Sequence, residues 1–370
     1  MLKYFSVENF KQFANKIEID FSDVRDYKFN EQCIKNGFIK DILVYGKNAS
    51  GKSNLGLAIM DITNHLVDKE KLPFLYDYYL NADSINKPAS FKYIFSFGED
   101  EVVYEYQKIN FVNLITESLT INGENIFYYN FQTQKFENNN LKIIYIDNLN
   151  WIFKGGNISV LRYIANNTAL NINSIISKLI RFVEGMLWFR RLDNANNFIG
   201  YKDPSSYGDI IEYLHEKNLI CDFEKFLQDS GVKEKVEFIK GPDGRNNLYF
   251  IHKGQNLPLS VASSGTKALL LFYTWYKQLE QATFVIIDEF DAFYHFELAE
   301  RIVNILINKV EAQVLLTSHN TNLLTNRLMR PDCYFILNEK GLNSFANSTK
   351  REIREGNNVE KLFISGEFGE

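Results

Sequence analysis

Residues 46–53 read Gly46-Lys47-Asn48-Ala49-Ser50-Gly51-Lys52-Ser53. They match the phosphate-loop pattern G-x-x-x-x-G-K-[ST] at every fixed position, and such a loop surrounds nucleotide phosphates with backbone N–H groups. The apolar run at 42–45 predicts a buried strand before the loop, and residues 54–60 have the spacing of a helix. The loop is therefore expected at a helix N-terminus, where free amides and the helix dipole favour an anion.

The residues of this loop have separate expected roles. The Lys52 ammonium is expected to reach the β and γ phosphates of ATP, and the Ser53 hydroxyl to ligate Mg²⁺. The predicted nucleotide-binding set also includes the following residues: Gly46, Lys47, Asn48, Ala49, Ser50, Gly51 and Asn54. A Gly/Ser turn that matches by chance is disfavoured by the strand and the helix that flank the motif.

A second motif completes the expected site. Residues 283–289 predict a buried strand that ends in Asp288 and Glu289. Ligands of α/β sheets bind at the carboxyl ends of such strands. We therefore expect Asp288 to hold Mg²⁺ through its water shell and Glu289 to orient and deprotonate the attacking water. The alternative is a strand that ends in two solvated acids, and the complete phosphate loop favours the functional interpretation.

The first part of the chain, 1–150, is expected to be an ATPase lobe with an antiparallel β region. Residues 2–21 predict a hairpin, and Asn122-Gly123 predicts a hairpin turn between further strands. The character of the sequence changes at Gly155-Gly156. We expect a helical insertion at 151–235, where apolar residues recur at helical spacing.

The last part, 236–370, is expected to be the second ATPase lobe. Strands are predicted at 236–239, 248–251, 284–287 and 313–317, and helices at 267–281, 296–310 and 320–328. Alternation of strands and helices predicts a parallel sheet with crossover helices. The fold class expected is therefore α/β.

The composition limits the class of protein. Of the 370 residues, 45% are hydrophobic and 24% charged, as in ordinary globular proteins, and a net charge of −5 gives no support to a surface that binds nucleic acid everywhere. Three widely spaced cysteines form neither a metal motif nor a disulfide framework. Without a signal-peptide core or an apolar run of about 18 residues, we expect a cytoplasmic protein with no membrane partner.

Residues 262–267, Ala-Ser-Ser-Gly-Thr-Lys, resemble the LSGGQ-like signature of ABC-type ATPases, including their SMC and RecF-like branch. Ala, Ser and Thr replace the usual Leu, first Gly and Gln. The resemblance implies that Ser263, Ser264 and Gly265 contact the γ-phosphate held by a partner subunit, so that a head-to-tail homodimer forms two composite sites. The alternative is an ordinary serine N-cap.

Two further elements resemble this family. Asp291 stands at the acid position of the D-loop, and His319, after the strand at 313–317, stands where the family has its switch histidine. His295 matches a histidine that is frequent in the branch, although Phe296 follows it in place of proline. The fold implied is an ABC/SMC-like P-loop ATPase head, with a mixed sheet, a flanking antiparallel β region and a helical insertion.

The chain is most similar to bacterial AAA-type ATP-binding proteins of the OLD-like and RloA–AbiL-like groups, and its tail at 357–369 resembles the end of those proteins. These groups imply a role in anti-phage defence. About 50 residues follow His319, fewer than a TOPRIM domain of ordinary size needs, so any nuclease effector is expected to be a separate protein.

Several questions stay open at this point. A RecF-like ATPase that clamps DNA, and a nucleotide-binding scaffold with little turnover, share the same motifs. Arg181, Arg190 and Arg191 either contact nucleic acid or a partner, or form a solvated basic edge. Gln107 is not singled out as a Q-loop residue. The residue that stacks on adenine is not chosen from the three aromatic candidates: Tyr4, Phe5 and Phe13.

Overall fold

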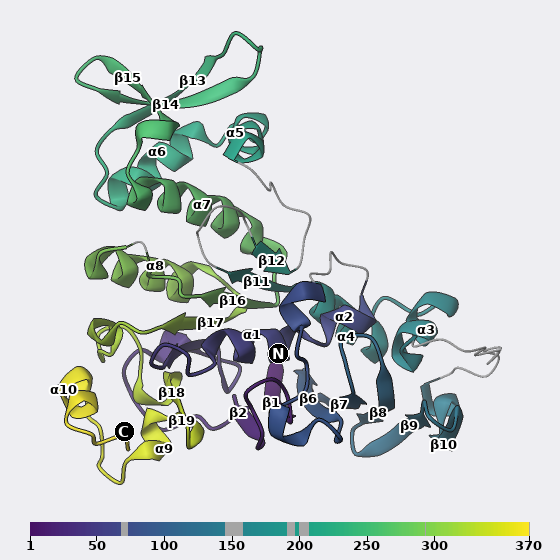
Figure 1. The fold of residues 1–370 in the computed structure, drawn as a ribbon. Helices are drawn as coiled ribbons and strands as arrows, with labels where there is room; N and C mark the ends of the chain where they lie inside the picture. Colours follow the sequence, from purple (N-terminus) through teal and green to yellow (C-terminus); the bar gives the residue numbers. More distant parts are fainter. Residues whose placement is uncertain (68–72, 145–157, 191–196, 200–206, 293, 370) are drawn as a thin grey trace.

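The structure is a computed structural model, and it describes residues 1–67, 73–144, 158–190, 197–199, 207–292 and 294–369. Within this part of the chain, a central mixed sheet lies beside an antiparallel sheet, and a small third sheet lies at the far end of the molecule (Figure 1). The α/β class expected from the sequence is confirmed.

The central sheet carries the phosphate loop. Its strand order is β12-β11-β16-β17-β5-β18-β19; the inner strands are parallel, and β12 and β19 are antiparallel to their neighbours. The bounds are β5 (Asp41–Tyr45), β11 (Met186–Arg190), β12 (Asn197–Ile199), β16 (Phe284–Asp288), β17 (Gln313–Ser318), β18 (Tyr334–Asn338) and β19 (Gly341–Ser344). Strands β5, β16 and β17 are buried along their whole length, because parallel strands are covered on both faces.

Helix α1 (Lys52–Met60) starts directly after the phosphate loop and packs against β11 and β16. Helix α1 approaches the sheet closely at Gly56, where an added Cβ would lie 2.7 Å from Nε1 of Trp188 on β11. A glycine inside this helix therefore allows the helix to lie close to the sheet. The other helices of this region are α2 (Thr63–Leu66), α7 (Ser264–Gln278), α8 (Phe296–Lys309), α9 (Phe345–Ser348) and α10 (Val359–Ile364).

The antiparallel sheet has the order β10-β9-β8-β7-β6-β1-β2. Its strands are β1 (Leu2–Glu8), β2 (Ile17–Asp20), β6 (Ala89–Phe97), β7 (Asp100–Lys108), β8 (Leu114–Ile121), β9 (Glu124–Asn130) and β10 (Lys135–Asn139), and a separate short pair is β3 (Ile34–Lys35) with β4 (Phe38–Ile39). The predicted hairpin at the start of the chain is confirmed as β1–β2. The predicted turn is confirmed too: Asn122 and Gly123 have φ of 50° and 82° between β8 and β9, as a type I′ turn requires.

A buried ion pair connects α1 to the antiparallel sheet. Lys108 Nζ on β7 lies 2.8 Å from Oδ2 of Asp61, which follows α1, and both side chains are 0% exposed. The Tyr106 hydroxyl donates to the same carboxylate oxygen at 2.9 Å. Because removing one member would leave a buried charge without its partner, this contact keeps the helix and the sheet together.

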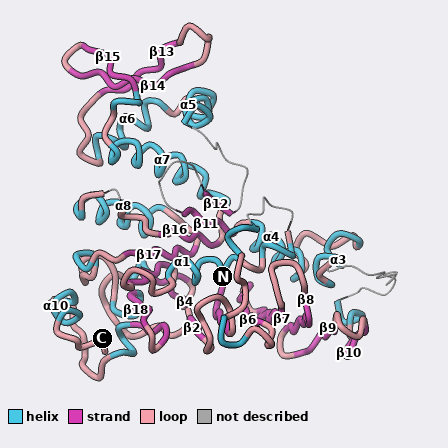
Figure 2. Tube along the Cα trace, in the orientation of Figure 1, coloured by secondary structure: helices cyan, strands magenta, loops and turns pink. Residues whose placement is uncertain are grey.

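The third sheet, with the order β13-β14-β15, lies outside helices α5 to α7, which separate it from the central sheet (Figure 2). Its strands are β13 (Lys235–Lys240), β14 (Asn246–His252) and β15 (Gln255–Pro258), and the nearby helices are α5 (Tyr207–Glu216) and α6 (Ile220–Asp229). Helices α3 (Val160–Asn167) and α4 (Ile175–Glu184) precede β11 in the chain.

The apolar spacing within the expected insertion predicts helix over 158–192, and this prediction is wrong at its C-terminal end. Helix α4 ends before Gly185, where an added Cβ would lie 2.6 Å from Thr283 Cγ2, and β11 then joins the central sheet beside β16. The segment predicted to be a helical insertion thus contributes a core strand. The division at 151 and 235 stays a prediction, and Gly155-Gly156 lies outside the described residues.

The helix expected at 320–328 is also wrong. The structure has only a 3₁₀ turn at Thr321–Leu323. The Asn326 amide donates to the carbonyls of Arg354 and Glu355 at 2.9 and 3.2 Å. An asparagine side chain can form hydrogen bonds that compete with a helix. Here its long-range hydrogen bonds stabilise a non-helical conformation after the 3₁₀ turn.

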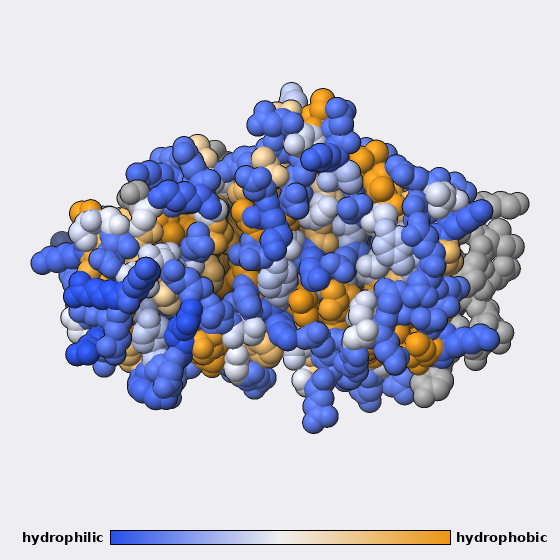
Figure 3. Space-filling model, turned by 90° about the horizontal axis from the view of Figure 1, so that it is seen from below, coloured by the Kyte–Doolittle hydropathy of each residue, from blue (hydrophilic) through white to orange (hydrophobic). Residues whose placement is uncertain are grey.

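The face seen from below in Figure 3 is mainly hydrophilic, with apolar residues in separate groups. In the part of the chain that the structure describes, no helix is both long and apolar enough to cross a membrane. The three cysteines are free; Cys33 and Cys333 are buried and Cys221 is exposed.

One prediction concerns Asp41, the first residue of β5. It is 1% exposed, lies 3.3 Å from Lys40 Nζ, and burial raises the pKa of its carboxyl group from 3.8 to about 7. Between pH 3.8 and about 7 the folded state therefore binds more protons than the unfolded state. The contribution of protonated Asp41 to the free energy of unfolding is complete below pH 3.8 and is lost as the pH rises through about 7. Urea unfolding from pH 4 to pH 8 should show the free energy of unfolding of the wild type falling by an amount on the order of a few kcal/mol, and Asp41→Asn should remove this pH dependence. Equal slopes in both proteins would contradict the prediction.

Candidate functional site

The phosphate loop connects β5 to α1, as the sequence predicted. Gly51 is the N-cap residue of α1 with φ of 101°, and no side chain caps the helix. Ala49 also has a left-handed φ, of 63°. The amides of the first helical turn therefore have no side-chain acceptor and face the space where an anion would bind.

The loop is too tightly folded to admit another side chain at Gly46. An added Cβ there would lie 2.4 Å from Ser50 Oγ and 2.9 Å from the Leu337 carbonyl oxygen. The Ser50 hydroxyl is buried and has no hydrogen-bond partner among the described residues. An anion inside the loop would give this hydroxyl an acceptor, so the loop fits a nucleotide phosphate.

Lys52 lies within the loop, 5% exposed, and its ammonium donates to the carbonyls of Gly46 and Lys47 at 2.6 and 3.1 Å. Burial lowers the pKa of Lys52, and the carboxylates of Glu289, Asp288 and Asp291 act in the opposite direction. The cation is therefore held beside the acids of the second motif.

Asp288 ends β16 and is 3% exposed. Its Oδ2 accepts a hydrogen bond from the Ser53 hydroxyl, and its Oδ1 accepts one from Thr317 Oγ1 at 2.6 Å. A serine hydroxyl beside one carboxylate is an oxygen set that suits Mg²⁺, which binds proteins through one or two carboxylates and completes its shell with water and phosphates. Ser53 and Asp288 would hold the ion.

Glu289 has a left-handed backbone, with φ of 49°, and its N–H donates to Thr317 Oγ1 at 2.8 Å. Its side chain is partly exposed, in contrast to the buried Asp288. The two acids therefore differ in environment: Asp288 is buried, and Glu289 is partly exposed.

Asp291 is 7% exposed and accepts a hydrogen bond from the Ser318 hydroxyl at 2.8 Å. Burial raises the pKa of Asp291, while this hydrogen bond and the nearby His319 act to lower it. His319 itself is exposed. Asp291 and His319 thus lie together at the end of β17, beside the two acids.

The structure does not bring the signature-like residues to this group within one chain. Ser263 is the N-cap of α7 and accepts from the Thr266 N–H at 3.1 Å, as the alternative interpretation expected. Ser263 and Ser264 are exposed, and Gly265 is partly buried. His295 is the exposed N-cap residue of α8.

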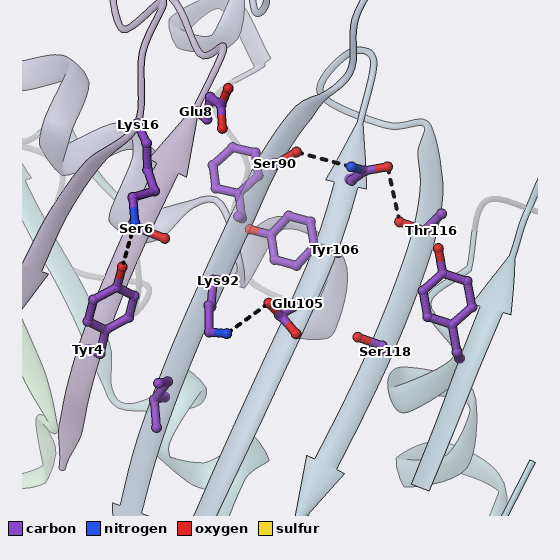
Figure 4. A pocket seen from close by; sticks show the side chains of 14 residues that line it. Tyr4, Ser6, Glu8, Lys16, Ser90, Lys92, Glu105, Tyr106, Thr116 and Ser118 are labelled. Atoms are coloured by element: carbon purple, nitrogen blue, oxygen red, sulfur yellow. Dashed lines mark hydrogen bonds and ion pairs between the residues drawn. The ribbon is translucent and has the colours of Figure 1, made fainter. Parts of the chain in front are cut away.

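Of the three aromatic candidates, Phe13 alone lines the cavity of about 860 Å³ that also borders residues 46–50. Phe5 is 0% exposed and packs on Tyr93. Tyr4 lines a different cavity of about 580 Å³ on the antiparallel sheet, together with Gln107, where Lys92 pairs with Glu105 (Figure 4).

The C-terminal segment of the chain packs against the residue before the phosphate loop and lines the same cavity as the loop. Phe363 of α10 packs edge-on against Tyr45, the residue before Gly46, with ring centroids 4.6 Å apart. Lys340 Nζ donates to the Gly369 carbonyl at 2.9 Å, and both residues line the larger cavity.

Sequence reasoning missed Thr317, Ser318 and Gln12. The first two were detectable as hydroxyl residues at the carboxyl end of a predicted buried strand. Gln12 has no such signal: its amide lies over Gly51 and its Oε1 accepts from Asn54 at 2.9 Å. Arg191 lies outside the described residues, as does the side chain of Arg190, and Arg181 bonds to carbonyls of its own segment.

The sequence matches a protein family described as "AAA domain, putative AbiEii toxin, Type IV TA system" over residues 42–325. A search among curated proteins finds no match.

Among solved structures, the SMC head domain from Thermotoga maritima is 16% identical, covering 90% of this chain and 94% of that chain, with a TM-score of 0.43. An Smc head bound to a ScpA domain derived from Pyrococcus furiosus is 14% identical, covering 93% and 95%, with a TM-score of 0.43.

A double-mutant cycle tests the position of Gln12. Gly51→Ala should destabilise the protein by about 1–2 kcal/mol for the left-handed backbone. The Gly51→Ala variant should lose about 1 kcal/mol more of its free energy of unfolding, because Gln12 must move and give up its hydrogen bond with Asn54. Gly37→Ala is the control, since φ is 78° there and nothing lies within 4 Å of an added Cβ. In a Gln12→Ala background, Gly51→Ala and Gly37→Ala should lower the free energy of unfolding, measured with urea, by the same amount. An unchanged excess for Gly51→Ala would contradict this arrangement.

Proposed function

Because the chain belongs to the AAA-domain family that matches residues 42–325, we propose that it binds ATP with Mg²⁺ and hydrolyses it to ADP and phosphate. One observation carries this proposal. The Ser53 hydroxyl of the phosphate loop and the Asp288 carboxylate of β16 are hydrogen-bonded to each other, although 235 positions separate them in the sequence. Two motifs that were identified independently therefore meet at one point.

Each residue has a role in this proposal. The amides of residues 46–53 bind the phosphates, and Lys52 exchanges its carbonyl contacts for phosphate oxygens. Ser53 and Asp288 would hold Mg²⁺, which would neutralise phosphate charge when bound. Glu289, which is partly exposed, would accept a proton from the attacking water. His319 and Asp291, which lie near each other at the end of β17, would act at the γ-phosphate.

We further propose that the site is completed by a second copy of the chain. Ser263, Ser264 and Gly265 lie at the exposed start of α7, away from their own phosphate loop, where the free amides of a helix N-terminus can meet a phosphate from outside. A two-fold head-to-tail dimer would place this helix end on the partner's nucleotide and form two equivalent sites.

The biological output we propose is a switch in bacterial defence of the OLD-like and RloA–AbiL-like kind, in which ATP-dependent dimerisation controls a separate effector protein. The family description, which names a toxin of a toxin–antitoxin system, supports a role in conflict systems. Among the described residues, no cluster of three or more His, Cys, Asp or Glu could form a second metal centre. Salt-sensitive, ATP-dependent DNA binding would instead favour a DNA clamp.

The first test is Glu289→Gln. Turnover should fall at least about 100-fold because the base is lost, while ATP binding is retained. The ATP-bound dimer should accumulate and be visible by size-exclusion chromatography with light scattering. Glu297→Gln, an exposed acid in the first turn of α8, is the matched control and should behave as wild type. Normal hydrolysis by Glu289→Gln would show that this residue is not the base.

The second test mixes two inactive variants. Lys52→Ala disables the phosphate loop, and Ser264→Arg disables the start of α7. Half of the dimers in an equal mixture are mixed, and each mixed dimer keeps one intact site, so about a quarter of wild-type phosphate release should return. A mixture as inactive as its components would rule out a composite site.

A further inference from the structure

Thr317 contacts the carboxylate of Asp288 and the backbone of Glu289, although no motif includes it. It lies near the end of β17 and is 0% exposed. Its hydroxyl donates to Asp288 Oδ1 at 2.6 Å and accepts from the Glu289 N–H at 2.8 Å. A threonine hydroxyl has a single hydrogen to donate, so these two contacts fix its orientation.

The backbone of Thr317 adds to this contact, since its carbonyl accepts from the Phe290 N–H at 3.4 Å. Strand β17 therefore holds three successive residues of the turn after β16. The middle one, Glu289, is a non-glycine residue with a left-handed φ of 49°. Such a conformation costs of order 1–3 kcal/mol and persists only where neighbouring groups stabilise it.

The two oxygens of Asp288 receive hydroxyls from opposite sides. Thr317 reaches Oδ1 from β17, and Ser53 reaches Oδ2 from α1. With Thr317 holding one oxygen, the other is directed at the Ser53 hydroxyl, with which it would share the ion. A group that orients a metal-binding carboxylate in this way commonly changes metal affinity 10–100-fold when it is removed.

We propose that Thr317 is the positioning residue of the site, in that its hydroxyl sets both the direction of the Asp288 carboxylate toward Mg²⁺ and the direction of Glu289 toward the attacking water. This inference rests on the proposed ATPase function for its second half. Its first half, the orientation of Asp288, applies to metal binding with or without turnover.

The test compares Thr317→Val, which keeps the shape and loses the hydroxyl, with Thr317→Ser, which keeps the hydroxyl. Thr274→Val is the matched control, because Thr274 is also 0% exposed and its hydroxyl donates to the Leu270 carbonyl of its own helix, α7. For Thr317→Val we expect a fall of about 100-fold in kcat with KM for ATP changed less than about threefold. The Kd for Mn²⁺, measured by electron paramagnetic resonance with ATPγS, should rise about tenfold.

Thr317→Ser should return both quantities to within about threefold of wild type, and Thr274→Val should leave both unchanged. Wild-type kcat and Mn²⁺ affinity in Thr317→Val would overturn the proposal. So would equal losses in Thr317→Val and Thr317→Ser, because these would show a packing role. If the wild-type protein does not hydrolyse ATP, the proposed function fails, and a tenfold loss of Mn²⁺ affinity in Thr317→Val that serine restores still supports the orientation of Asp288.

Discussion

The carboxylate of Asp288 joins three elements that are far apart in the chain. It stands at the end of β16, it accepts hydroxyls from α1 and from β17, and it is almost completely buried. A buried carboxylate needs donors to offset the loss of water, so these hydroxyls fix how the helix and the strands meet. The parallel register supports the same geometry, because Ile287 pairs with Leu316 and Tyr45 with Ser318. The carboxyl ends of β5, which precedes the loop, and of β16, which carries the acids, therefore lie at the same edge of the sheet.

Buried charges elsewhere show what this arrangement achieves. Asp61 has both an ammonium and a tyrosine hydroxyl on one oxygen, and it connects α1 to the antiparallel sheet. Asp41 has Lys40 3.3 Å away, but burial outweighs this contact and raises the pKa of its carboxyl group. The cation Lys52 is surrounded by carbonyls and acids. Helix α1 is therefore held by polar contacts at both ends, and its position relative to the sheets is well determined.

Much of this architecture could be predicted, for a physical reason. Strands buried on both faces, such as β5, β16 and β17, appear in sequence as unbroken apolar runs, and the loop and the acids follow at their ends. Strands β11 and β18 are also apolar, but a short apolar run does not distinguish a strand from a buried helix segment. The course of residues 320–328 depends on Asn326, whose hydrogen-bond acceptors lie about 30 residues later in the chain. The contacts of Thr317 depend on the register between two strands, which no single segment encodes.

The position of β5 also has a consequence for how the protein is made. All strands of the antiparallel sheet precede residue 140, so this sheet can form while the rest of the chain is still being synthesised. Strand β5 emerges among them, but its neighbours β17 and β18 begin only at residues 313 and 334. Until then this strand, which is apolar from Ile42 to Tyr45, has both edges open, a state that invites association with other chains and assistance from chaperones. The segment that carries the phosphate loop thus leaves the ribosome long before β17 and β18, its partners in the sheet, are synthesised.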